Sequence, residues 1–251
     1  MRRHPPLALA YHGVARVPLR DDRHGLFTDP RALRSHIGRL RAWGYRLVTF
    51  GELAAEAAAG RGAGLAALTF DDGLADNLHE LVPVLREEQA PATVFVIAGL
   101  LGEPHPDYGG ARLLDPSELR ELARAVEIGS HSVHHLDLTS VSVDVARREL
   151  AESRRCLGEI TGAPVDVLSY PFGCVNEAVM EAAREAGYRA AAGVSGQGAW
   201  DEPMYLPRQD MTNGGTMLSL RLKRDNRYEP LMRFRVVRLA RAMRRRIAAA
   251  L

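Results

Sequence analysis

The stretch Leu65-Ala-Ala-Leu-Thr-Phe-Asp-Asp-Gly73 runs from a short apolar segment directly into two adjacent carboxylates and a glycine. A short apolar run with β-branched or aromatic residues predicts a buried strand. Similar runs recur along the chain, so we expect a sheet of several strands. The expected strands are Leu7–Tyr11, Tyr45–Phe50, Leu65–Phe70, Ala92–Ala98, Val126–Gly129, Val165–Tyr170, Arg189–Val194 and Met204–Pro207.

Amphipathic helical segments lie between most of these strands. One begins at Asp29, an N-cap residue followed by a proline suited to the first helical position, and ends at Gly44. Strand–helix alternation predicts a parallel sheet covered by helices, and seven or eight such units are typical of a closed (β/α) barrel. An open doubly wound sheet is the alternative, but no Gly-x-Gly-x-x-Gly turn follows the first strand. The other expected helices are Asp76–Glu88, Asp115–Arg124, Val143–Ile160 and Asn176–Ala186.

The composition is that of a globular α/β domain with a sizeable core. Hydrophobic residues make up 46% and charged residues 25% of the 251 residues, which excludes disordered, collagen-like and disulfide-scaffold classes. Cys156 and Cys174 do not form a disulfide framework, and no apolar run is long enough for a membrane span. The N-terminus has only a short apolar stretch and does not match a signal peptide, so we expect a cytoplasmic protein.

Charge is distributed unevenly along the chain. The formal net charge is +2, but residues 221–251 hold eleven Lys or Arg against Asp225 and Glu229. We therefore expect a barrel domain over residues 1–220 and a basic, helical tail over residues 221–251. Two interpretations of the tail remain open: a helix that caps the barrel, or a peripheral helix at the inner membrane surface. We expect no nucleic-acid partner.

Residues with catalytic potential follow the ends of the expected strands. In a parallel barrel these ends share one rim, where active sites form, so residues far apart in sequence are predicted to meet there. The residues are His12, Asp71, Asp72, His131, the turn Pro171-Phe172-Gly173, and Arg208.

The segment His131-Ser-Val-His-His135 supplies three imidazoles in five residues. His131 and His135 converge on one metal ion if the loop takes a helical turn, and His131 with His134 is the competing pair. Two histidines and one carboxylate from another strand end form an open metal site, which leaves room for water and substrate. The acidic pair before Gly73 has an alternative interpretation as a solvated helix N-terminus, with Asp76 close behind it.

At these residues the sequence resembles the polysaccharide deacetylase family, the NodB-homology domain of carbohydrate esterase family 4. Thr69–Gly73 matches the family's Thr-Phe-Asp-Asp-Gly motif, and His131–His135 matches its His-[Ser/Thr]-x-x-His motif. Ser169–Gly173 matches Arg-x-Pro-[Phe/Tyr]-Gly except at its first position. The resemblance spans about Leu7 to Asp210, most of the chain.

The resemblance implies a distorted (β/α) barrel of about seven strands that binds a divalent metal, usually zinc. Asp71 would be the general base, and the backbone N–H of Phe172 would help to stabilise the oxyanion. Tyr170, Pro171 and Phe172 would line the substrate side of their turn. The implied metal ligands are Asp72, His131 and His135.

Two departures from the family pattern affect the implied mechanism. Ser169 stands where many members have the arginine that orients the catalytic aspartate, and Arg208 is the candidate to supply that charge from another strand end. No histidine follows His135, so the family's late Leu-x-His motif, which carries the general acid, is absent. Leu9-Ala-Tyr-His12 instead resembles the subgroup that includes poly-N-acetylglucosamine deacetylases, in which the acid histidine lies near the N-terminus. We therefore assign the acid to His12.

These features predict a metal-dependent hydrolase that removes an N-acetyl or other acyl group from an amino sugar in a saccharide or a lipid-linked sugar. Two other classes stay open. One is an inactive barrel that binds saccharide or a membrane surface, suggested by Ser169 and the missing late histidine. The other is a non-haem iron oxygenase, which also uses two histidines and one carboxylate. The histidines without a partner pattern, interpreted as surface residues, are His4, His24, His36, His79 and His105.

Overall fold

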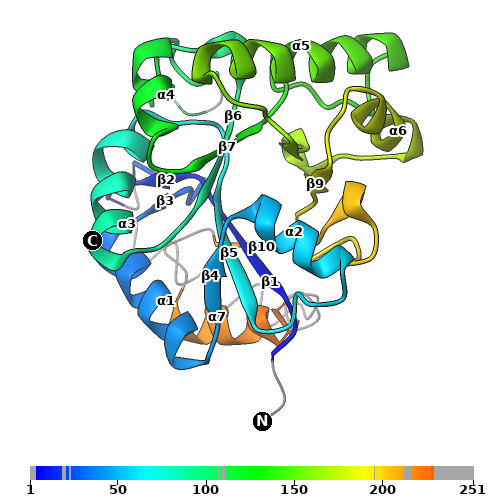
Figure 1. The fold of residues 1–251 in the computed structure, drawn as a ribbon. Coiled ribbons are helices and arrows are strands. Elements are labelled where there is room, and N and C mark those ends of the chain that lie inside the picture. The colour runs from blue at the N-terminus through cyan, green and yellow to red at the C-terminus, as the bar shows by residue number, and fades with distance from the viewer. Residues whose placement is uncertain are drawn as a thin grey trace.

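The computed structural model describes residues 4–18, 21–22, 24–106, 108, 111–194, 196–211, 216–225 and 227–228. They form a curled parallel sheet surrounded by helices (Figure 1). Seven strands follow one another in the order β10-β1-β5-β6-β7-β8-β9, and β4 also pairs with β5. The strands of this sheet are β1 (Leu7–Tyr11), β4 (Arg46–Val48), β5 (Leu65–Phe70), β6 (Thr93–Val96), β7 (Glu127–Ser130), β8 (Val167–Ser169), β9 (Ala190–Ala192) and β10 (Gln209–Asp210). A separate parallel pair is formed by β2 (Gly13–Val14) and β3 (Phe27–Thr28).

Local sequence signals set the ends of the helices. The α-helices in the described part of the chain are α1 (Pro30–Ala42), α2 (Phe50–Ala58), α3 (Val82–Glu88), α4 (Pro116–Leu122), α5 (Val143–Thr161), α6 (Glu177–Glu185) and α7 (Met217–Arg224). Asp29 caps α1 and Pro30 occupies its first position, as predicted. Asp115 likewise caps α4. The segment predicted as one helix from Asp76 to Glu88 begins with a π-helical turn over Asn77–Leu81.

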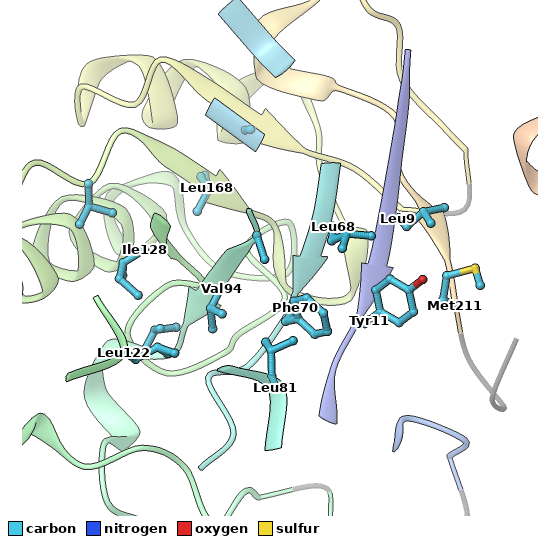
Figure 2. Close-up of a cluster of buried hydrophobic side chains, with 14 of the residues drawn as sticks. Leu9, Tyr11, Leu68, Phe70, Leu81, Val94, Leu122, Ile128, Leu168 and Met211 are labelled. Atoms are coloured by element: carbon cyan, nitrogen blue, oxygen red, sulfur yellow. The ribbon is translucent and has the colours of Figure 1, made fainter. Parts of the chain in front are cut away.

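Side chains alternate between the two faces of the sheet. Large apolar residues such as Leu68 and Phe70 point outward and pack in the core cluster that the surrounding helices complete (Figure 2). Small residues such as Ala67 and Gly129 point inward. A side chain at Gly129 would meet the Phe95 ring at 2.4 Å, so only glycine permits this close approach. The small inward residues allow the sheet to curl, and residues of α2 pack in the same inner cluster as Ala67 and Phe95.

Within the described residues, the two end strands of the sheet, β9 and β10, do not pair with each other. An isolated parallel bridge joins Ala192 to Leu206 across this gap, and Arg208 Nε donates a hydrogen bond to the Gly193 carbonyl at 2.9 Å. We call this gap, bounded by residues 192–193 and 206–208, the seam. The curled parallel sheet confirms the prediction of a single-domain, distorted (β/α) barrel.

The predicted last strand, Met204–Pro207, is wrong. Pro203–Tyr205 forms a 3₁₀ turn, because Pro203 occupies its first position and the Glu202 side chain caps it. The last strand of the sheet, Gln209–Asp210, follows this turn and pairs with β1.

The predicted boundary between barrel and tail, at residues 220 and 221, lies within α7. Arg224 of α7 stacks over Trp43, which caps the C-terminal end of α1, with its guanidinium carbon 4.3 Å from the ring centroid. The predicted tail beyond residue 228 lies outside the described residues. None of the described helices is both long and apolar enough to cross a membrane.

His36 is buried, so its interpretation as a surface residue is wrong. It lies on the same buried face of α1 as Leu33, Ile37 and Leu40. Its Nδ1 is 3.1 Å from the Tyr11 hydroxyl. The helical spacing of these four residues is the sequence pattern that predicts the burial of His36.

Candidate metal and catalytic centre

Asp71 and Asp72 follow β5 at the rim of the sheet, and both are buried. Successive residues of a strand point to opposite faces, so a continued strand would separate the two carboxylates. Asp72 instead has a backbone φ of +75°, and Gly73 follows with a φ of +73°. This left-handed conformation is uncommon for a residue other than glycine, and it turns the chain so that both carboxylates reach one site.

Asp72 faces two of the predicted metal-ligating imidazoles. Its Oδ1 is 3.4 Å from Nε2 of His131 and 3.6 Å from Nε2 of His135. One ligand atom from each of these three residues lies within 4.8 Å of the other two. Among the described residues, neither carboxylate oxygen of Asp72 has a hydrogen-bond partner, although both are buried. An ionised carboxylate buried in this way is costly unless a cation balances its charge.

The electrostatic surroundings keep Asp72 ionised. Burial by itself raises the pKa of its carboxyl group. The facing imidazoles of His105 and His131, together with the charge of His12, outweigh burial and hold this pKa well below its usual value. The carboxylate is therefore in the state that binds a metal ion.

The orientation of His131 is set by the neighbouring strand. Its Nδ1 lies 2.7 Å from the Ser169 carbonyl oxygen, which can only accept a hydrogen bond, so Nδ1 carries the proton. Nε2 faces Asp72 and is the ring nitrogen left to bind a metal ion. A histidine that donates through one nitrogen to a carbonyl and binds a metal through the other is the usual arrangement in metal sites.

His135 reaches the site without the helical turn that the sequence analysis required. Ser132 and His135 have φ values of +62° and +55°, and the His135 N–H donates to the Ser132 hydroxyl at 3.1 Å. These turns bring His135 beside His131, with ring centroids 4.9 Å apart. His134 is not part of the group of ligand atoms around Asp72, so the competing pair is not the one assembled.

Glu149 anchors this loop, and sequence analysis missed it. Its Oε2 accepts hydrogen bonds from the backbone N–H groups of Val133 and His134 at 3.0 and 2.9 Å, and its Oε1 lies 2.6 Å from His134 Nδ1. Glu149 belongs to α5 and is buried on the same face as Ala146 and Leu150. A glutamate in an apolar helical stripe was the available signal, since buried carboxylates need partners.

Asp71 is held by Arg208 in a buried, bidentate ion pair. Nη1 and Nη2 of Arg208 donate to the two carboxylate oxygens at 2.7 and 2.8 Å. Nη1 also donates to the Thr69 hydroxyl and Nη2 to the Ser169 hydroxyl. Arg208 therefore lies where its positive charge can replace that of the arginine missing at position 169.

Burial by itself raises the pKa of Asp71, but the charge and hydrogen bonds of Arg208, together with the charges of His131 and His12, outweigh burial and lower the pKa below its usual value. The Ser169 hydroxyl lies 3.4 Å from Asp71 Oδ2. The guanidinium of Arg208 also packs over the Phe95 ring, 5.2 Å from its centroid. Asp71 is thus ionised and fixed in orientation.

His12 follows β1 and lies close enough to both aspartates for its charge to lower their pKa values. The Asn77 side chain donates to the His12 carbonyl at 3.1 Å, and Asp76 accepts a hydrogen bond from the Val14 N–H at 3.0 Å. Asp76 and Asn77, at the start of the π-helical turn, thus hold the backbone on either side of Gly13. The acidic pair that precedes Gly73 is buried, so its alternative interpretation as a solvated helix N-terminus is wrong.

The turn after β8 presents one of its three predicted substrate-side residues to solvent. Phe172 is 57% exposed, has a φ of +58°, and packs its ring 4.5 Å from that of His135. Tyr170 and Pro171 are buried, and the Tyr170 hydroxyl donates to the Met204 carbonyl. Tyr170 and Pro171 support the turn from below, and Phe172 borders the site.

His105 is buried beside the site, so its interpretation as a surface residue is wrong. Its Nε2 lies 3.5 Å from Asp72 Oδ2, and its ring stacks on Tyr108. The loop between β6 and α4 brings it there. No sequence signal marked it, because the backbone pairing of that loop depends on contacts with the segment after β5.

Comparisons with known proteins give matches to one family. Residues 59–191 match the model of the polysaccharide deacetylase family. The Bacillus subtilis protein YxkH is 30% identical over 140 residues, which cover 55% of this chain and 48% of YxkH. A chitooligosaccharide deacetylase of Rhizobium leguminosarum is 29% identical over 127 residues, covering 49% of this chain and 53% of that protein. The chain thus spans about half the length of these relatives.

The fold is also found in solved structures. The Streptococcus pyogenes deacetylase PplD, in complex with acetate, superposes with a TM-score of 0.75 over 89% of this chain and 99% of that one, at 22% identity. IcaB from Ammonifex degensii gives a TM-score of 0.73 over 90% of this chain and 98% of that one, at 21% identity. The family model covers just over half of the chain, and its span contains the acidic pair and the histidine loop that meet at the rim. The chain therefore belongs to the polysaccharide deacetylase family.

Proposed function

We propose that the chain is a metal-dependent hydrolase that removes the N-acetyl group from an amino sugar in a saccharide or glycoconjugate. The observation that carries the proposal is the contrast between two adjacent buried carboxylates. Asp71 is fully hydrogen-bonded by Arg208, whereas Asp72 faces two imidazoles and has no hydrogen-bond partner among the described residues. One carboxylate is suited to accept a proton and the other to bind a cation.

The residues around Asp72 fit a divalent metal such as zinc. One carboxylate oxygen and two imidazole nitrogens form the open, three-ligand donor set of catalytic zinc sites. The separations of 3.4 and 3.6 Å between these atoms suit donors that each lie about 2.1 Å from one shared ion. A divalent cation bound there supplies positive charge that polarises the acyl carbonyl and lowers the pKa of a water molecule.

The remaining residues divide the proton transfers. Asp71 accepts the proton of the attacking water, and Arg208 keeps its carboxylate ionised and oriented. The backbone N–H of Phe172 donates to the acyl oxygen as negative charge develops on it. His12 gives a proton to the sugar nitrogen as the carbon–nitrogen bond breaks, because an amine is a poor leaving group. The products are acetate and a free amino sugar.

The position of Arg208 weakens the non-catalytic alternative. That alternative depended partly on Ser169, which lacks the charge to orient the base. Arg208 supplies this charge and donates to the Ser169 hydroxyl at 2.7 Å. The matched family and the chitooligosaccharide deacetylase relative support an N-acetylated saccharide substrate over an oxygenase reaction.

The test is acetate release from a panel of N-acetylated substrates. The panel contains chitooligosaccharides, β-1,6-linked N-acetylglucosamine oligomers and a lipid-linked N-acetylated sugar. We expect equal amounts of acetate and free amine from at least one substrate, loss of the reaction with a chelator, and recovery with added zinc. Release that persists in metal-free protein, or no release by zinc-loaded protein from any N-acetylated sugar, contradicts the proposal.

The role of His12 is tested by the leaving group. His12→Ala is expected to lower kcat on the amide substrate by about 10²–10⁴-fold, because the amine must be protonated to leave. The same variant should lose much less activity on a nitrophenyl acetate ester, whose leaving group needs no proton. His79→Ala, which removes an exposed imidazole beside Glu118, is the control. Equal losses on amide and ester would show that His12 is not the acid.

A further inference from the structure

His105 is buried beside Asp72 and has no role in the mechanism proposed above. Its side chain is fully buried, and its Nε2 lies 3.5 Å from Oδ2 of Asp72. The other two imidazoles face the opposite oxygen: Nε2 of His131 and Nε2 of His135 lie 3.4 and 3.6 Å from Oδ1. The two oxygens of this carboxylate therefore have different neighbours.

His105 differs from the metal-ligand group in its placement. The ligand atoms of Asp72, His131 and His135 lie within 4.8 Å of one another, and His105 is not a member of that group. Asp72 would hold a cation of this group through Oδ1, the oxygen that both imidazoles of the group face. Oδ2 then remains available to a hydrogen-bond donor, and carboxylates that bind metals commonly have such a donor.

The loop that carries His105 is fixed to the segment that follows Asp72. The His105 N–H donates to the Ala111 carbonyl at 2.7 Å, so the two sides of the loop pair next to the imidazole. The returning side then pairs Leu113 with Leu74, two residues after Asp72. His105 and the carboxylate it faces are thus tied together by backbone hydrogen bonds.

Neighbouring rings fix the plane of the imidazole. Tyr108 stacks on His105 with ring centroids 3.9 Å apart and an angle of 13° between the planes. The His135 ring meets it edge-on, at 5.8 Å and 73°. A histidine held by backbone pairing and by two rings has lost most of its rotamer freedom, which suits a group that orients another side chain.

We propose that His105 is a positioning residue: when the metal is bound, its Nε2, which here lies 3.5 Å from Oδ2 of Asp72, donates a hydrogen bond to that oxygen and so keeps Oδ1 turned toward His131 and His135. The inference rests on the proposed metal site. It predicts that loss of this donor weakens metal binding without changing the set of protein ligands. Removal of such a donor typically lowers metal affinity by about 10–100-fold.

The experiment measures zinc affinity by competition with a chromophoric chelator. His105→Leu is expected to bind zinc about 10–100-fold more weakly than the unmodified chain. His105→Gln keeps an N–H donor of similar reach and should recover most of the affinity. His105→Asn, whose amide is too short to reach Oδ2, should behave like His105→Leu and replaces it if that variant does not fold. His36→Leu, which removes a buried imidazole that contacts Tyr11, should leave zinc affinity unchanged.

Cobalt binding separates a positioning residue from a ligand. At saturating Co²⁺, the visible absorption spectra of His105→Leu and the unmodified chain should coincide, because the ligands are the same. Unchanged zinc affinity in His105→Leu overturns the inference. A changed cobalt spectrum also overturns it, since His105 is then itself a ligand. Failure of the unmodified chain to bind zinc contradicts the proposed function, and the zinc stoichiometry of that chain distinguishes this result from failure of the inference alone.

Discussion

The two carboxylates at the end of β5 are neighbours in sequence but lie in different surroundings. Asp71 is bonded through both oxygens to Arg208, with the Ser169 hydroxyl beside them. Asp72 has no hydrogen-bond partner within the described residues and faces imidazoles at 3.4–3.6 Å. Two side chains of the same type are therefore suited to two different functions by their surroundings.

The surroundings of Asp71 and Asp72 differ because their neighbours come from different parts of the fold. Asp71 is surrounded by the sheet: Thr69 and Ser169 are strand residues, and Arg208 directly precedes β10. Asp72 faces histidines of the segments that follow β6 and β7, and His135 reaches it through left-handed backbone turns. We therefore call these the sheet side and the loop side of the site. The sheet side depends on the integrity of the barrel, and the loop side depends on a few anchoring contacts.

The largest expected effect separates the two sides by metal content. Asp71→Asn is expected to lower kcat by about 10²–10⁴-fold and to retain one zinc per chain, because it removes a base and no ligand. His131→Ala should lose both zinc and activity. Metal analysis of the purified variants, with circular dichroism as the control for folding, makes the comparison. Equal zinc loss in both variants would contradict the assignment of Asp71 as the base and of Asp72 as a metal ligand.

The next effect concerns the sheet side. Arg208→Met leaves the Asp71 carboxylate buried without its charged partner, and breaking a buried ion pair in this way costs about 3–5 kcal/mol of the free energy of unfolding. Burial of Asp71 is then opposed only by the charges of His131 and His12, so its pKa rises and the acidic limb of the pH–rate profile should move to higher pH. Urea unfolding and the pH dependence of kcat measure the two effects. An unchanged acidic limb would contradict the assigned role of Arg208.

A paired exchange sharpens this prediction. Ser169→Arg combined with Arg208→Met moves the guanidinium to the position that the family pattern prefers. We expect the double variant to recover more activity than either single variant, because the space left by Arg208 accommodates the new side chain. Recovery no better than that of Arg208→Met would show that the location of the charge, as well as its presence, is required.

A smaller effect concerns the loop side. Glu149→Gln replaces the acceptor of two backbone N–H groups and of the His134 ring by a group that can accept at only one oxygen. Loss of a buried, charge-assisted acceptor should cost about 1–3 kcal/mol of the free energy of unfolding and weaken zinc binding. Glu152→Gln, an exposed position on the same helix, is the matched control. If both variants bind zinc equally, Glu149 does not anchor the histidine loop.

The last expected effect is a change in how the stability of the protein depends on pH. Burial raises the pKa of Asp76 from 3.8 to about 7. The folded protein therefore holds a proton that the unfolded chain has released, and the stability that this proton contributes is lost as pH rises from about 4 to about 7. Asp76→Asn removes this titration, so its free energy of unfolding should fall less over that range. Asp144→Asn, at an exposed position, should follow the unmodified chain.

The sequence predicted the parallel barrel and the meeting of its strand ends, because hydrophobic periodicity and helix caps are local signals. It also identified the residues that face one another at the rim, Asp71, Asp72, His131, His135 and Arg208. His105 was missed because its burial arises from tertiary contacts that no local pattern records, whereas the burial of Glu149 could have been predicted from its place in the apolar stripe of a helix. The strand expected at Met204–Pro207 was wrong, because Pro203 and Glu202 favour a turn over the hydrophobic run that follows.

The seam has a consequence for how such proteins diverge. Arg208 donates to the Gly193 carbonyl, which follows β9, and to Asp71, which follows β5, so the alignment of the base and the closure of the seam depend on one side chain. A single replacement at this position disturbs both at once. Moving the guanidinium to position 169, as in the family pattern, therefore requires changes at both positions. Compensating changes at positions 169 and 208 should occur together across lineages.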